Sequence, residues 1–274
     1  MMRSLTPLDK GERDNSAQTV PVVQTADSAM QTNATKVGSS AARRRPAKAI
    51  KPSLTWEKRL WADGHRLVAG VDEVGRGAWA GPLTVGVVVL AQPPCRTPSG
   101  LRDSKQLVEE VRERLFDPLA RWCAAWAVGH AGPEECDSIG MTAALRLATR
   151  RALDGLAPDF LPDAVVLDGN FDYVSPDAAP SLFDEPDPRP SDWKPVVQTV
   201  IKADAKCSSV AAASVLAKVT RDRMMRADAG SYPPFDFDRN KGYPSPAHQR
   251  ALRGYGLTAI HRRSWIYVDD LPWR

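Results

Sequence analysis

Apolar runs of strand length recur along the chain from about residue 54, and longer segments with helical spacing of apolar residues lie between them. The apolar runs predict five strands, at about 68–71, 85–90, 122–129, 164–168 and 196–204. The longer segments predict helices at about 55–61, 104–116, 133–155 and 208–225, with a last one ending near Gly254. Strands and helices that alternate in this way are typical of an α/β protein.

The first 53 residues lack this pattern and are rich in Ser, Thr, Ala, Gln and Pro, so we expect a disordered basic tail at 1–53. The globular domain is then expected to occupy 54–274. The tail ends in a basic run from Arg43 to Lys51, which either tethers the protein weakly to nucleic acid or is only a solvated linker. A second unpatterned segment, 171–195, is acidic and rich in proline, which predicts an exposed loop.

Composition and charge narrow the class of protein only coarsely. The hydrophobic share of 43% is ordinary for a globular protein, and no apolar run approaches the roughly 20 residues that span a bilayer. The N-terminus has no apolar core of the signal-peptide kind, so we expect a cytoplasmic protein without membrane contact. The net charge of +4 is uneven, because the tail carries +5 and the remainder −1. Contact between the domain and nucleic acid therefore requires local basic patches.

The cysteines and histidines give no sign of a metal or disulfide framework. Four cysteines, at positions 95, 123, 136 and 207, are widely spaced, and the four histidines show no ligand spacing. A zinc site is therefore not expected. Nothing in the sequence requires an oligomer, so we expect a monomer.

The strongest chemical signal is the stretch Val68-Ala-Gly-Val-Asp-Glu-Val-Gly-Arg-Gly77. Two adjacent acids, Asp72 and Glu73, come at the end of a core strand, and a glycine-flanked arginine follows. Oxygen ligands are what Mg²⁺ and Mn²⁺ prefer, so the pair indicates a metal-assisted site. The alternative is that both acids are ordinary residues of a hairpin turn.

Two further acids stand at the ends of predicted strands, Asp168 and Asp204. Carboxylates from different strands can converge where a sheet opens, the usual ligand position in α/β sheets. Asp222 competes with Asp204, but it lies inside a helix four residues from Lys218, and ordinary pairing on the helix surface accounts for it. We therefore predict one site formed by four carboxylates: Asp72, Glu73, Asp168 and Asp204.

The decapeptide resembles the signature of bacterial ribonuclease HII, in which Asp-Glu-x-Gly-Arg-Gly follows an apolar strand. The match is complete at Asp72, Glu73, Gly75, Arg76 and Gly77.

The family also carries acids at the places of Asp168 and Asp204 and a Gly-Tyr at the place of Tyr243, in the same order along the chain. One departure is Ala203, where the family usually has glycine. The resemblance covers roughly residues 65–265, apart from 171–195, which is longer than the family's segment and is interpreted as a loop insertion.

The resemblance implies a ribonuclease H-like fold: a mixed five-stranded sheet with helices on both faces, and a helical C-terminal extension that contacts substrate at about 239–274. It implies an endonuclease that hydrolyses the RNA strand of RNA–DNA hybrids. It also implies nicking 5′ of single ribonucleotides in duplex DNA, leaving a 3′-hydroxyl and a 5′-phosphate. Crowded carboxylates repel one another unless cations lie among them, so two Mg²⁺ or Mn²⁺ ions are expected.

The substrate must be distinguished from plain DNA through the ribose 2′-hydroxyl. The family resemblance gives this role to the backbone of Gly75, Arg76 and Gly77. It further implies that Lys105, in the element Asp-Ser-Lys, meets the nucleic-acid backbone, and that Tyr243 packs on the nucleic acid at the cleavage junction. From the residues alone, the Lys105 element could equally be a plain helix cap and Tyr243 a buried turn residue.

Two other functions fit parts of the pattern. A different nuclease of the ribonuclease H fold, such as a resolvase or transposase core, also uses strand-end carboxylates but has no need for Arg76 and Tyr243. The sister ribonuclease HIII carries a folded N-terminal domain, which the tail does not resemble. A non-catalytic module that only binds hybrids would be weakened by four acids, because carboxylates repel phosphate unless metals are present.

Overall fold

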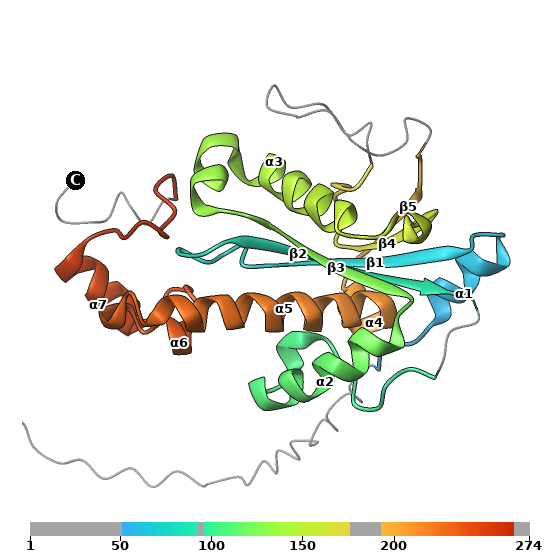
Figure 1. Cartoon of the computed structure of the whole chain (residues 1–274), viewed down its shortest axis with the longest axis horizontal. Coiled ribbons are helices and arrows are strands. Elements are labelled where there is room, and N and C mark those ends of the chain that lie inside the picture. Colours follow the sequence, from blue (N-terminus) through green and yellow to red (C-terminus); the bar gives the residue numbers. More distant parts are fainter. Residues whose placement is uncertain (1–50, 93–95, 176–192, 266–274) are drawn as a thin grey trace, which may run out of the picture. The chain divides into compact units, whose positions relative to one another are not determined.

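A mixed five-stranded sheet forms the centre of the protein in a computed structural model, which describes residues 51–92, 96–175 and 193–265 (Figure 1). Its strands are β1 (Leu67–Val74), β2 (Leu83–Ala91), β3 (Ala125–Ala131), β4 (Ala164–Asp168) and β5 (Val196–Val200). They lie in the order β3-β2-β1-β4-β5. β1–β2 and β2–β3 pair antiparallel, whereas β1–β4 and β4–β5 pair parallel. The predicted fold class is therefore confirmed.

Helices cover both faces of the sheet. α3 (Pro133–Asp154) lies on one face, while α5 (Ser208–Ala229) and α2 (Glu109–Trp122) lie on the other (Figure 1). α1 (Thr55–Ala62) packs its buried Leu60 and Trp61 into the α5 side. Alternate residues of each strand enter the two hydrophobic clusters, so the core is built from both faces of the same strands.

The close approach of α5 to the sheet comes from small residues on both partners. A side chain at Gly70 of β1 would lie 2.3 Å from the backbone of Ser209, and one at Gly86 of β2 would lie 2.7 Å from the carbonyl oxygen of Ala213. Such distances are too short for any other residue, so the two glycines allow the helix backbone to lie against the strands. This packing carries the polar side of α5 to the end of β1, where the acids are.

The C-terminal part is helical, as predicted. α6 (Phe237–Asn240) and α7 (Pro246–Tyr255) surround a third, smaller apolar cluster. Among the described residues, short 3₁₀ turns occur at Ser104–Gln106, Pro158–Phe160 and Pro233–Phe235. None of the helices in the described ranges is long and apolar enough to cross a bilayer.

Two predicted elements differ from the structure. The helix expected from 104 begins only at Glu109, because Asp103 accepts the N–H of Lys105 and caps a 3₁₀ turn instead, and Leu107 is extended. The strand expected to reach Asp204 ends at Val200. Lys202 then takes a left-handed conformation (φ 58°), and the chain turns into the one-turn helix α4 (Ala203–Lys206).

The N-terminus of α5 is capped from another element. Cys207 holds the cap position, and its side chain makes no capping hydrogen bond. Instead, Glu57 of α1 accepts hydrogen bonds from the amide and the hydroxyl of Ser209, at 2.8 and 2.7 Å. A carboxylate at a helix N-terminus satisfies free amides and favours the helix dipole.

The predicted tail lies outside the described residues up to position 50, as does the loop insertion from 176 to 192. At the domain border, Ser53 forms a parallel bridge with Cys207. Ser53 therefore lies beside the residue that follows α4.

Candidate active site

Asp72 and Glu73 lie within β1 and not in a turn. Asp72 is paired with Gly86 and Glu73 with Val85 of β2, so the interpretation as hairpin-turn residues is wrong. Adjacent residues of a strand point to opposite faces of the sheet. Asp72 therefore points to the α5 side, and Glu73 points to the α3 side. The two acids therefore lie at the same end of β1 but on different faces of the sheet.

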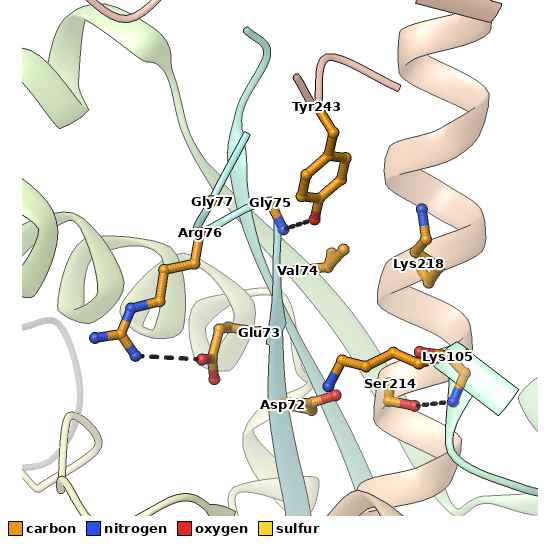
Figure 2. A pocket seen from close by; sticks show the side chains of 11 residues that line it. Asp72, Glu73, Val74, Gly75, Arg76, Gly77, Lys105, Ser214, Lys218 and Tyr243 are labelled. Atoms are coloured by element: carbon orange, nitrogen blue, oxygen red, sulfur yellow. Dashed lines mark hydrogen bonds and ion pairs between the residues drawn. The ribbon is translucent and has the colours of Figure 1, made fainter. Parts of the chain in front are cut away.

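Asp72 is buried at the bottom of a hollow of about 250 Å³ (Figure 2). The walls come from the 3₁₀ turn with Ser104 and Lys105, from Ser214 and Lys218 of α5, and from the loop after β1. Burial, and after it the charge of Glu73, hold the pKa of Asp72 well above its ordinary value. An anion at this depth is costly without a cation beside it.

Asp168 and Asp204 are tied together by the backbone. The amide N–H of Ala203 donates to Asp168 Oδ1 at 2.6 Å, which joins the end of β4 to the helix α4 that carries Asp204. Burial and the nearby charge of Asp204 raise the pKa of Asp168. Both carboxylates also act electrostatically on Asp72. The structure thus brings all four predicted acids into one region, although Asp204 comes from a helix and not from a strand end.

Lys105 lies beside these acids. Its Nζ is 3.0 Å from Asp204 Oδ2, and Asp204 itself is only 6% exposed. Although burial opposes it, the hydrogen bond to Asp204 and the charge of Asp72 raise the pKa of Lys105. The side chain of Lys105 therefore places a positive charge among the carboxylates.

The donor set fits divalent cations of the Mg²⁺ class. All four side chains offer carboxylate oxygens, and their mutual repulsion calls for positive charge. Within the described residues, no three His, Cys, Asp or Glu side chains stand so as to hold one ion directly. Asp204 is instead paired with the ammonium group of Lys105. The carboxylate side chains would therefore have to move locally to bind cations.

Glu73 is held from two sides on the opposite face. The Tyr173 hydroxyl donates to Glu73 Oε2 at 3.0 Å, and Arg76 Nη1 lies 3.7 Å from Oε1. A second hollow of about 230 Å³ opens there, bordered by Asp168 and the exposed ring of Phe171. Glu73 and Arg76 line both hollows, whereas Asp72 borders only the first and Asp168 only the second.

The loop after β1 is fastened to Tyr243. The Gly75 N–H donates to the Tyr243 hydroxyl oxygen at 3.1 Å, so the phenol group closes one wall of the first hollow (Figure 2). The ring of Tyr243 is half-buried, with the guanidinium of Arg221 5.4 Å from its centre. Tyr243 is therefore neither a fully buried turn residue nor a free platform: one side is anchored and the other faces the hollow.

Comparison with known proteins adds the family. The sequence profile described as Ribonuclease HII matches residues 69–268. The chain belongs to the ribonuclease HII family. It is 49% identical to ribonuclease HII of Streptomyces avermitilis over 225 residues, covering 81% of this chain and 88% of the relative. It is 42% identical to the Paracoccus denitrificans ribonuclease HII over 220 residues, covering 80% and 94%.

Solved structures agree on the fold. The ribonuclease H2 of Pyrococcus horikoshii superposes with a TM-score of 0.57 at 29% identity, over 74% of this chain and 96% of that one. The ribonuclease HII that is complexed with PCNA in Archaeoglobus fulgidus gives 0.53 at 24% identity, over 73% and 95%. As a ribonuclease HII family member, the chain is an endoribonuclease of the ribonuclease H type. A resolvase or transposase core is thereby excluded.

Several residues of the site were not predicted from the sequence. On α5, Ser214, Lys218 and Arg221 follow one another at helical spacing and face the end of β1. This polar stripe on an otherwise small-residue face was a usable signal. Tyr173 gave none, because it lies in the acidic, Pro-rich segment.

The interpretation of Asp222 as a helix-surface residue is wrong in part. It does pair with Lys218, at 2.5 Å. It is only 2% exposed, however, and it also forms an ion pair with Arg112 of α2 at 3.6 Å. Asp222 thus holds Lys218 in place through an ion pair, and Asp204 remains the fourth acid of the candidate site.

Gly75 and Gly77 form a matched pair for a stability test. Gly75 has φ +86°, and a side chain there would lie 2.4 Å from Arg221 Nε, whereas nothing lies within 4 Å of such a position at Gly77. We expect Gly75→Ala to cost about 1–3 kcal/mol and to lower the Tm by several degrees. Gly77→Ala should leave the Tm within about 1 °C. Thermal melts followed by circular dichroism measure both, and equal melting temperatures would contradict the close packing at Gly75.

Asp72→Asn should raise the Tm of the protein in chelator near pH 7. Below the ordinary pKa of 3.8 the carboxyl is protonated in folded and unfolded chains alike. As the pH rises, the unfolded chain ionises first, so the raised pKa means lost stability that asparagine would not suffer. The difference in Tm between the Asp72→Asn variant and the wild-type protein should decrease as the pH is lowered toward 4.

The control for this measurement is Asp163→Asn. Asp163 accepts the amides of Arg66 and Leu67 at the other end of β1, at 2.8 and 3.0 Å. Its loss should lower the Tm. A fall in Tm for both variants would show that Asp72 is not under electrostatic strain.

Proposed function

We propose that this ribonuclease HII hydrolyses the RNA strand of RNA–DNA hybrids and nicks duplex DNA 5′ of single embedded ribonucleotides. The products would carry a 3′-hydroxyl and a 5′-phosphate. Catalysis would depend on Mg²⁺ or Mn²⁺ held by Asp72, Glu73, Asp168 and Asp204. The enzyme would act as a monomer in the cytoplasm.

The observation that carries the proposal is the position of the acids beside the loop Gly75–Gly77. Asp72 and Glu73 stand three and two residues before Gly75 on the same strand, and Tyr243 closes the loop from the far side at 3.1 Å. A nucleotide bound in the hollow would therefore have its phosphate near the acids. Its ribose would lie near the backbone of the adjacent loop. That combination suits a nuclease selective for the 2′-hydroxyl.

The protein groups have distinct parts in this reaction. When bound, two divalent cations would supply activation of the attacking water and neutralisation of charge on the leaving oxygen. Lys105 would release Asp204 and turn to the nucleic-acid backbone, since its side chain is 70% exposed and free to swing outward. The side chain of Arg76, which is also exposed, would contact the nucleic-acid strand near the scissile phosphate. Partly buried Lys218 would stay paired with Asp222 in the wall of the hollow.

The deciding experiment uses a DNA duplex that contains one ribonucleotide, with Mg²⁺, with Mn²⁺ and with chelator. Metal-dependent nicking on the 5′ side of the ribonucleotide is the expected result. Cleavage only within longer hybrids would keep the four-acid site but remove the junction role of Gly75–Gly77 and Tyr243. Binding without cleavage in either metal would mean a hybrid-binding module.

A further inference from the structure

Two buried histidines link the substrate-contacting segments, and the reaction described above does not use them. His248 of α7 and His261 are 0% and 1% exposed, and their Nε2 atoms lie 2.9 Å apart. Phe235 and Phe237 surround both rings, with ring centres 5.0 to 6.0 Å away. A direct contact between two imidazoles in an apolar cage requires one nitrogen to donate and the other to accept.

The hydrogen-bond partners of the two Nδ1 atoms determine which Nε2 atom donates and which accepts. The main-chain N–H of Thr258 donates to His261 Nδ1 at 2.9 Å, so that nitrogen carries no proton. A neutral His261 then holds its proton on Nε2 and donates it to His248 Nε2. His248 in turn holds its proton on Nδ1 and donates to the carbonyl oxygen of Tyr243 at 3.0 Å. Burial lowers the pKa of His261 to about 3 and also lowers that of His248, in keeping with two neutral rings.

The His248–His261 pair is part of a closed circuit of contacts that includes Tyr243 and the loop after β1. From His261 the chain passes to Arg262, whose Nη1 donates to the carbonyl oxygen of Arg76 at 3.1 Å. From Arg76 the chain passes back to Gly75, whose N–H donates to the Tyr243 hydroxyl. Tyr243 is thus held at both ends: its carbonyl by the histidine pair and its hydroxyl by the loop.

We infer that the His248–His261 pair is a positioning device that fixes the Tyr243 ring against the Gly75–Gly77 loop and so sets selectivity for a ribonucleotide at an RNA-to-DNA junction. The inference rests on the proposed function. A long hybrid is held by many contacts along the strand. A single ribonucleotide is recognised only where tyrosine and loop meet, so their spacing matters most for that substrate.

Two substitutions of one residue separate this role from a purely structural one. His261→Gln places an amide N–H where Nε2 was and keeps the donor to His248. His261→Asn is too short to reach His248, although its oxygen can still accept the Thr258 N–H. Both remove the imidazole from the same cage, so a general packing loss would affect both alike.

The measured quantity is kcat/KM on a single-ribonucleotide duplex divided by kcat/KM on a uniform hybrid. His261→Asn should lower this ratio about tenfold, the effect of one lost hydrogen bond on positioning. His261→Gln should keep the ratio within about twofold. Equal ratios for the two variants would overturn the inference. A wild-type enzyme that fails to nick the single-ribonucleotide duplex would overturn the proposed function first, and this inference with it.

The wild-type rings provide a second measurement that needs no variant. A long-range ¹H–¹⁵N spectrum at pH 7 should show His261 with a bare Nδ1 and His248 with a bare Nε2. Either ring in the opposite tautomer, or charged, would overturn the circuit even if the variants behaved as expected.

Discussion

Asp72→Asn is expected to reduce kcat on both substrates by at least about 10³-fold while leaving hybrid binding within about threefold. Asp72 is the most buried of the four acids, at 3% exposure, and the charges of all three others act on it. Asparagine keeps the shape of the side chain but removes one charge from the proposed cation site. Cleavage is followed on labelled hybrid, and binding by fluorescence anisotropy in Ca²⁺ or chelator.

Asp163→Asn is the matched control for activity as well, because it changes the same residue type at the opposite end of β1. It should retain cleavage wherever it remains folded. Full activity of Asp72→Asn would remove Asp72 from the metal site. A parallel loss of binding would instead indicate that the substitution disturbs the hollow.

The sheet and the main acids could be predicted from the sequence because they depend on local pattern. Valine-rich runs bounded by glycine or acids form β1, β2 and β4 close to the expected positions. The pair Asp72–Glu73 was recognised from its glycine-flanked arginine. Even so, alternation within β1 sends the two acids to opposite faces, a consequence of β1 continuing to Val74 that the sequence prediction did not include.

The features that the sequence does not predict depend on contacts between residues far apart in the chain. The α5 cap comes from Glu57, 152 residues before Ser209. The hydroxyl that holds Glu73 belongs to Tyr173, 100 residues away. Asp204 lies in a helix because Lys202 adopts a left-handed turn, which no local propensity of lysine favours. Such choices are fixed by tertiary packing and cannot be derived from spacing alone.

Substitution of Tyr243 is expected to lower kcat/KM more on the single-ribonucleotide duplex than on a uniform hybrid. Tyr243→Ala removes both the ring that borders the hollow and the acceptor of the Gly75 N–H. Loss of a ring that packs on a nucleotide costs about 1–3 kcal/mol, or roughly 5- to 150-fold in kcat/KM. We expect this loss on the single-ribonucleotide duplex and a loss below about fivefold on a uniform hybrid, where neighbouring nucleotides compensate.

Tyr243→Phe distinguishes the ring from the hydroxyl. Phenylalanine keeps the packing surface and the contact with the Arg221 guanidinium, but it leaves the Gly75 N–H without its partner. An intermediate loss, of roughly five- to tenfold on the single-ribonucleotide duplex, is the expected result. Equal losses on both substrates for Tyr243→Ala would contradict a junction role. A phenylalanine variant as impaired as the alanine variant would shift that role from the ring to the hydroxyl and the loop that it holds.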